Sequence, residues 1–166
     1  YITKADIFNK AYGAFENCAS HHSTFGGNSL CCKAALKALD LLSSPELIKS
    51  VKENGSYFLI KLKENFKGNA LINEIRGQGL LIGIDFNEVT HPWLSWENLG
   101  IKDFAGSNPI PSIIMKQLLS KGFITNVCGH NWNVLKIEPP LTINKNNIDD
   151  FIDTLKESIN YINGLT

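Results

Sequence analysis

A short stretch of the chain, Ser20 to Leu30, concentrates groups that could bind a phosphate. Two histidines and three hydroxyl side chains precede two adjacent glycines, and an Ala-rich apolar run follows. Hydroxyls, backbone N–H groups that glycine leaves accessible, and a helix N-terminus are groups with which proteins hold phosphate. The residues alone leave two interpretations open with similar weight. The stretch is either a phosphate-binding loop or a glycine-containing loop that only caps the next helix.

Other polar groups near this loop favour structural roles. His21 and His22 are adjacent, with no Asp or Glu at ligand spacing, so we expect hydrogen bonding and predict no metal site. Asn28 is expected to cap the following helix. The four cysteines include no Cys-x-x-Cys pair. Cys31 and Cys32 lie in an apolar, helical context, so we expect them to be small buried residues.

Three motifs, taken in order along the chain, resemble signatures of one enzyme family. His21 to Asn28 reads His-His-Ser-Thr-Phe-Gly-Gly-Asn, Glu74 to Gly83 contains Arg-Gly-Gln-Gly-Leu, and Leu135 to Leu141 reads Leu-Lys-Ile-Glu-Pro-Pro-Leu. Together they resemble the class III aminotransferases, the ornithine and putrescine aminotransferase-like enzymes that use pyridoxal 5'-phosphate. The resemblance covers nearly the whole chain, and three ordered motifs are far more specific than one.

The resemblance implies roles for particular residues. Thr24, with Ser23 beside it, would reach the cofactor phosphate across a dimer interface, so a homodimer with shared active sites is expected. The family's Schiff-base lysine, pyridinium-binding aspartate and ring-stacking aromatic residue would all precede Tyr1. We therefore assign no catalytic residue to this chain and expect it to be inactive alone. The partners implied are a small-molecule amino donor and a keto acceptor, free or carrier-bound.

The chain departs from the family pattern at Lys136, where the family has a carboxylate-binding arginine. A guanidinium grips a carboxylate with a two-pronged fork, whereas an ammonium is a point charge. Lys136 stays a candidate substrate-binding residue, but an amine or diamine donor, or an amino group on a carrier, is favoured over ornithine. We favour a structural role for Arg76, as a buried or edge anchor that donates hydrogen bonds to carbonyl groups, over a catalytic role.

Helix and strand signals are distributed along the whole chain. Ser44-Pro45 is a typical helix start, and the apolar period continues to about residue 66, with Gly55 expected to kink the helix or pack closely. Glycines divide residues 71–86 into two short strands. The remaining expected elements are a short helix through Phe8 and Tyr12 that Gly13 ends, helices at 29–42, 110–121 and from Asn144 to the end, and a strand pair at 123–127 and 134–137.

These elements predict an α+β fold, with a small antiparallel or mixed sheet covered by helices on one face. By resemblance, residues 68–166 are the small domain of a fold type I pyridoxal-phosphate enzyme. Residues 44–67 would be a bridging helix, and residues 1–43 the end of the large α/β domain. Tyr1 reads as the end of a strand in a larger unit. The irregular segment 87–109 is either a lid or subunit contact or a loop pinned by tryptophans.

Composition narrows the class of protein. The 166 residues carry 16 basic and 16 acidic side chains, so no net charge draws the chain to nucleic acid or to an anionic membrane. Free thiols and the lack of an export signal predict a cytoplasmic protein. The main prediction is the carboxy-terminal part of an aminotransferase. The alternative is a non-catalytic α+β interaction module derived from such an enzyme.

Overall fold

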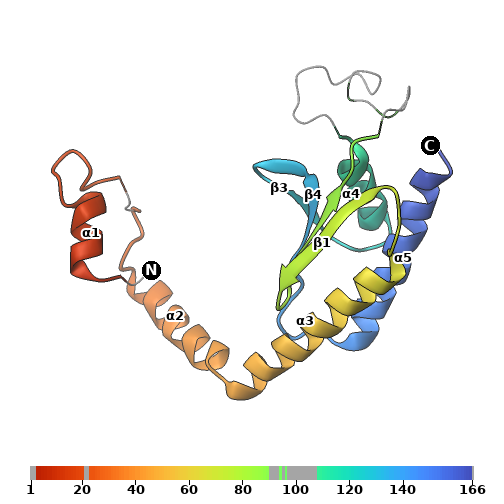
Figure 1. Cartoon of the computed structure of the whole chain (residues 1–166). Helices are drawn as coiled ribbons and strands as arrows, with labels where there is room; N and C mark the ends of the chain where they lie inside the picture. The colour runs from red at the N-terminus through yellow and green to blue at the C-terminus, as the bar shows by residue number, and fades with distance from the viewer. Residues whose placement is uncertain (1–2, 21–22, 90–93, 95, 97–107, 166) are drawn as a thin grey trace. The chain divides into compact units, whose positions relative to one another are not determined.

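Two units make up the chain, residues 1–43 and residues 44–166. The computed structural model describes residues 3–20, 23–89, 94, 96 and 108–165 (Figure 1). Each unit is described by itself.

The first unit consists of two helices and the loop between them. Helix α1 runs Ala5–Tyr12 and ends at Gly13, and helix α2 runs Ser29–Leu42. As expected, Asn28 caps α2: its side-chain oxygen accepts hydrogen bonds from the next backbone N–H groups. No residue of either helix is buried.

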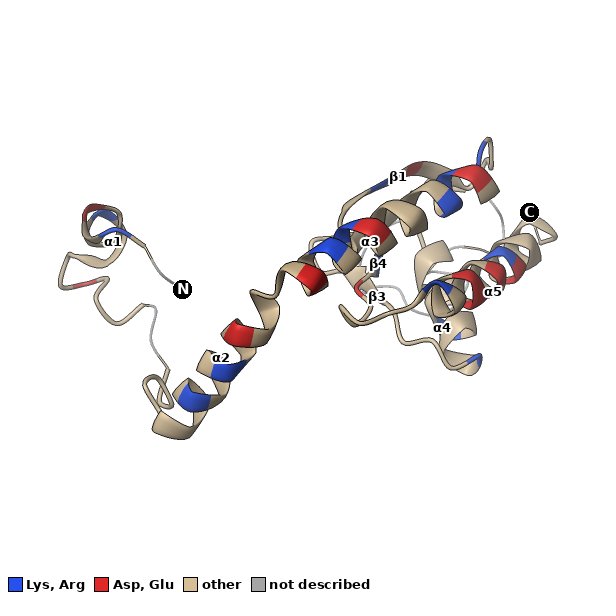
Figure 2. Ribbon diagram, turned by 90° about the horizontal axis from the view of Figure 1, so that it is seen from below, with Lys and Arg blue, Asp and Glu red and all other residues tan. Residues whose placement is uncertain are grey.

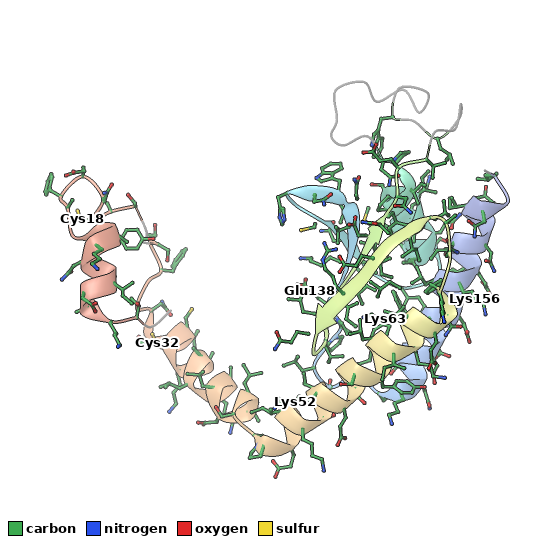
Figure 3. All side chains as sticks on the ribbon, in the orientation of Figure 1. Cys18, Cys32, Lys52, Lys63, Glu138 and Lys156 are labelled. Atoms are coloured by element: carbon green, nitrogen blue, oxygen red, sulfur yellow. The ribbon has the colours of Figure 1, made fainter. Side chains whose placement is uncertain are left out.

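The prediction that Cys31 and Cys32 are buried is wrong for this chain. Both thiols are free and exposed. Figure 3 shows the side chains of α2, Cys32 among them, projecting from the helix. The physical reason is that, within residues 1–43, α1 and the loop do not cover the apolar residues of α2.

The second unit is a four-stranded antiparallel sheet with three helices on one face (Figure 1). Helix α3 packs on β1, α4 packs on β3 and β4, and α5 packs on α3 and α4. The strands lie in the order β1-β2-β4-β3. This is the predicted α+β architecture. The elements are α3 Pro45–Asn65, β1 Ile72–Gln78, β2 Leu81–Phe86, α4 Ile110–Ser120, β3 Asn126–Cys128, β4 Asn131–Ile137 and α5 Lys145–Asn163.

The predicted helix signals are confirmed at their residues. The Ser44 hydroxyl accepts a hydrogen bond from the Leu47 N–H at 3.3 Å, and Pro45 occupies the first turn of α3. The Asn144 side chain caps α5 in the same way. Gly55 was predicted either to kink the helix or to pack closely, and the second prediction is confirmed by its contact with Gly79. A Cβ atom added there would lie 2.3 Å from the carbonyl oxygen of Gly79, so α3 meets the β1–β2 turn backbone to backbone.

The core lies between the sheet and its helices. Alternate strand residues, such as Ile84 and Leu135, point toward the helices and are fully buried. The Phe151 ring meets the rings of Phe58 and Phe123 edge-on, with centroids 5.6 and 5.4 Å apart. Each such side chain stabilises the fold by about 1.5–3 kcal/mol when fully buried.

Strand β3 is shorter than predicted and begins later. The pattern predicted a strand from residue 123, but the Phe123 N–H donates to the carbonyl of Leu118 at the end of α4. Its ring packs in the core, which holds the backbone away from the sheet. Most of the segment 87–109, including His91 and Trp93, lies outside the described residues. The described Trp96 packs against Trp132 with ring centroids 6.5 Å apart.

Candidate functional site

The predicted phosphate loop turns twice between Ser23 and Asn28. The Gly26 N–H donates to the Ser23 carbonyl at 3.0 Å, and the Asn28 N–H donates to the Phe25 carbonyl at 3.1 Å. Gly27 has a φ of 75°, a left-handed conformation that glycine adopts without strain. The loop therefore leads directly into α2 and leaves Ser23 and Thr24 exposed.

The cap of α2 limits how an anion could bind at this loop. The Asn28 side-chain oxygen accepts from the N–H groups of Leu30 and Cys31, both at 3.1 Å. Those groups would otherwise bind an anion at a helix N-terminus. The exposed Ser23 and Thr24 hydroxyls are donors available to an anion here, close to the positive end of the helix dipole. His21 and His22 lie outside the described residues.

Lys136 lies in a row of residues that crosses the sheet. The strand register pairs Arg76 with Gly83, Gly83 with Lys136, and Lys136 with Asn126. Paired residues of an antiparallel sheet point to the same face, and this face is opposite the helix-covered one, because neighbouring residues such as Ile84 point to the core. We call it the open face.

Gly83 leaves the middle of this row without a side chain. A groove of about 360 Å³ lies on the open face, with Arg76 on one side of Gly83 and Lys136 on the other. We call it the open-face groove. Its lining residues are Arg76, Gly77, Gln78, Leu81, Ile82, Gly83, Cys128, His130, Asn131, Val134 and Lys136.

Carboxylates pair with both cations of the groove. Arg76 Nη1 lies 2.6 Å from Glu74 Oε2 and 3.6 Å from Asp85 Oδ2, and Lys136 Nζ lies 2.8 Å from Glu138 Oε2. The hydrogen bond to Glu138 raises the pKa of Lys136, and the bond to Glu74 raises the pKa of Arg76. The expectation that Arg76 bonds to carbonyls is wrong, because neighbouring strand residues supply carboxylates within reach.

A thiol and an imidazole line the groove at the β3–β4 turn. Cys128 Sγ lies 3.4 Å from His130 Nδ1. Both residues lie in the segment that joins the two predicted strands, and the sequence predicted no role for them. Their Cys-x-His spacing at a hairpin turn was the available signal, because it places two side chains on the same side of a tight turn.

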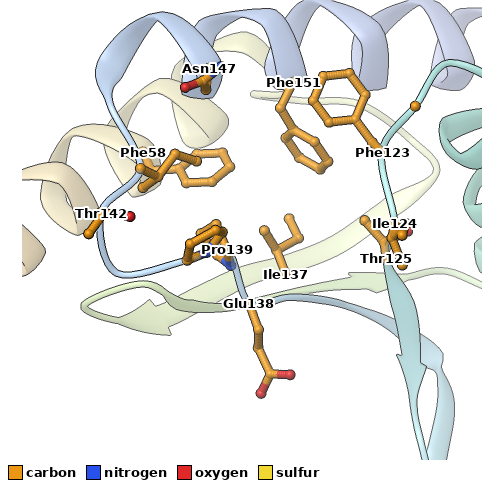
Figure 4. A pocket seen from close by; sticks show the side chains of 13 residues that line it. Phe58, Phe123, Ile124, Thr125, Ile137, Glu138, Pro139, Thr142, Asn147 and Phe151 are labelled. Carbon is orange, nitrogen blue, oxygen red and sulfur yellow. The ribbon is translucent and has the colours of Figure 1, made fainter. Parts of the chain in front are cut away.

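A larger hollow lies on the other side of the sheet. Its volume is about 550 Å³, and the rings of Phe58, Phe123 and Phe151 form much of its wall (Figure 4). Glu138 is also at its edge, but Figure 4 shows its carboxylate pointing away from the rings. The ring-lined wall of the hollow is thus apolar, whereas the cationic side chains of Arg76 and Lys136 line the open-face groove.

Within the described residues, no group of three His, Cys, Asp or Glu side chains is arranged to hold a metal ion. None of the helices in this part of the chain combines the length and the apolar character needed to cross a membrane. Charged side chains of both signs are spread over α3 and α5 (Figure 2).

Comparison with known proteins identifies the family. The sequence model described as aminotransferase class-III matches residues 2–159. The chain belongs to the class III aminotransferase family. Acetylornithine aminotransferase of Methanocaldococcus jannaschii is 36% identical over 139 residues, and ornithine aminotransferase of Macrococcus caseolyticus is 35% identical over 141 residues. These alignments cover 82% and 85% of this chain.

Solved structures of aminotransferases share the fold. An aminotransferase of Bacillus anthracis superposes with a TM-score of 0.69 at 30% identity, covering 96% of this chain and 34% of that one. Ornithine aminotransferase of Plasmodium yoelii gives 0.63 at 25% identity, covering 85% of this chain and 33% of that one. The chain spans 29% of the length of the two curated relatives, so it corresponds to part of such an enzyme.

Proposed function

We propose that the full-length protein is a pyridoxal-phosphate-dependent aminotransferase and that this chain forms its carboxy-terminal part. The enzyme would transfer an amino group from an amine or amino acid donor to a keto or aldehyde acceptor. Residues 1–43 would be the end of the large domain, and residues 68–166 would be the small domain. Residues 44–67 would form the helix that bridges the two domains. A cytoplasmic homodimer is part of the proposal, because the loop at Thr24 would serve the active site of the other subunit.

The observation that carries this proposal is membership in the class III family together with the loop geometry. The residues fit a phosphate: two exposed hydroxyls stand side by side, Gly27 has a left-handed backbone, and a helix begins directly afterwards. Pyridoxal phosphate, when bound, supplies the electron sink for breaking bonds at the donor carbon. The roles proposed for this chain are to hold the phosphate through Thr24 and Ser23 and to line the substrate pocket with Lys136.

The test is Thr24→Val in the full-length protein, which keeps the side-chain shape and removes the hydroxyl donor. One hydrogen bond to a charged group contributes about 1.5–3 kcal/mol, so we expect roughly ten- to a hundredfold weaker retention of the cofactor. The measurement is cofactor absorbance after dialysis at a series of free pyridoxal-phosphate concentrations. Thr3→Val, an exposed threonine of the same unit, is the matched control.

Two results would count against the proposal in different ways. Equal cofactor retention in Thr24→Val and Thr3→Val would show that the loop is only a helix cap. A full-length protein that holds no pyridoxal phosphate at all would favour the alternative, a non-catalytic α+β interaction module derived from an aminotransferase.

A further inference from the structure

A thiol and an imidazole meet at the turn between β3 and β4. Cys128 ends β3, Gly129 and His130 form the turn, and Cys128 pairs with Asn131 in the strand register. Cys128 Sγ lies 3.4 Å from His130 Nδ1 and 3.9 Å from His130 Nε2. When the imidazole carries its hydrogen on Nε2, Nδ1 accepts a hydrogen bond from the thiol. The imidazole is therefore placed to take the thiol proton.

The sulfur of Cys128 lies beside a groove and close to a cation. Cys128 is half-buried and lines the open-face groove, whose volume is about 360 Å³ and to which Leu81 and Val134 add apolar surface. The pKa of Lys136, on the same groove, is raised mainly by its hydrogen bond to Glu138 and further by the charge of Cys128. Partly exposed thiols beside a base and a cation are the reactive ones in proteins.

The other three cysteines of the chain have different surroundings. Cys18, Cys31 and Cys32 are exposed. The Cys18 thiol donates a hydrogen bond to the carbonyl oxygen of Phe15 at 3.0 Å, and a carbonyl oxygen takes up no proton near neutral pH. Cys31 and Cys32 lie near the start of α2, where the helix dipole favours a thiolate. Exposure alone would make the half-buried Cys128 the slowest of the four to react.

We propose that Cys128 and His130 form a covalent modification site for small uncharged α,β-unsaturated carbonyl compounds that enter the open-face groove. His130 takes the thiol proton, the sulfur attacks the β-carbon of the alkene, and the imidazolium returns the proton to the α-carbon. An S–C bond and a C–H bond form, an S–H bond and the carbon–carbon π bond break, and no oxidant or reductant is needed. An uncharged compound is favoured because carboxylates already pair with Arg76 and Lys136.

The experiment compares the rates at which the four cysteines of the 166-residue chain react with acrylamide. Peptide mass spectrometry at neutral pH follows each cysteine separately. We expect Cys128 to react at least about tenfold faster than Cys18, since a positioned general base contributes about a hundredfold or more in enzymes. His130→Gln keeps a polar side chain that takes up no proton, and it should slow Cys128 about tenfold. The rates of the other three cysteines should stay unchanged, so they are internal controls.

A second measurement shows whether the adduct lies in the groove. In the variant that combines Cys18→Ser, Cys31→Ser and Cys32→Ser, acrylamide has Cys128 as its one thiol target. We expect the ¹⁵N-labelled amides of Gly77 and Gly83, which line the groove, to shift on modification. The amide of Gly68, in the turn after α3, does not line the groove and should not shift.

Three results would each overturn the proposal. Cys128 may react no faster than Cys18 in the parent chain. The substitution His130→Gln may leave the rate at Cys128 unchanged. Modification of Cys128 may leave the Gly77 and Gly83 amides unshifted, which would place the adduct outside the groove. The proposal does not depend on the proposed function, because the reaction and both measurements need no cofactor.

Discussion

Leucines of helix α2 are exposed, whereas leucines in the core of the second unit are buried. In α2, Leu36 and Leu39 are 60% and 56% exposed, whereas Leu62 of α3 and Leu155 of α5 are fully buried. The charged residues of α2 are confined to one stripe (Figure 2), at Lys33, Lys37 and Asp40. A helix that is apolar over the rest of its surface is typical of a buried element.

The residues that stabilise the fold therefore lie in a different unit from the loop that is proposed to bind the phosphate. Residues 44–166 contain the whole described core, while the loop proposed to hold the phosphate lies in a unit that buries none of its helix residues. The second unit has what it needs to fold by itself. The first has local hydrogen bonds and a helix cap, but neither of its helices has a buried residue.

The largest expected effect is in hydrogen exchange of the 166-residue chain. Core amides of β2 and β4 should open only with global unfolding, whereas amides of α1 and α2 should open at a cost on the order of 1 kcal/mol or less. Exchange measured by NMR or mass spectrometry would show this as protected and unprotected blocks. Equal protection in α2 and β4 would contradict the separation.

A pair of matched substitutions gives the next largest contrast. Leu62→Ala removes a fully buried side chain from a helix, and we expect it to lower the free energy of unfolding by about 2–5 kcal/mol. Leu39→Ala makes the same change in α2, where the side chain is exposed, and should stay within about 0.5 kcal/mol. Urea denaturation measures both. A comparable loss in Leu39→Ala would mean that α2 shares the cooperative core.

A smaller effect is expected at the contact between α3 and the β1–β2 turn. Alanine raises helix propensity over glycine by about 1 kcal/mol, but its Cβ at position 55 would meet the Gly79 carbonyl at 2.3 Å. We expect Gly55→Ala to destabilise the second unit by about 1–3 kcal/mol. The control is Gly129→Ala at the β3–β4 turn, where nothing lies within 4 Å of an added Cβ. Stabilisation by Gly55→Ala would show that the turn moves aside.

Local chemistry predicted most of the fold. Asn28, Ser44 and Asn144 cap helices where their side chains predicted helix starts, because a cap depends only on residues two or three positions away. The family followed from three motifs and the fold class from the order of helix and strand signals, and the comparisons confirm both. The roles of Thr24 and Lys136 stay predictions.

The predictions that were wrong or missing concern contacts between parts of the chain that are far apart in sequence. The apolar context of Cys31 correctly indicated a helix, but it could not show whether a covering surface exists within the same 166 residues. The open-face groove was missed because it requires the register that pairs Gly83 with Arg76 and Lys136, and residues 83 and 136 are far apart in sequence. Glu138, the carboxylate partner of Lys136, lies only two residues away in the sequence and could have been predicted.

The strand register also determines how the sheet resists aggregation. Within the described residues, β1 and β3 form the two edges, and an exposed edge can pair with another chain. Strand β3 is three residues long and its register shifts between Val127 and Cys128, so it offers little to pair with. Strand β1 is longer, but it carries Glu74 and Arg76 and a register shift of its own. The charges beside the groove therefore also protect the sheet against edge-to-edge association.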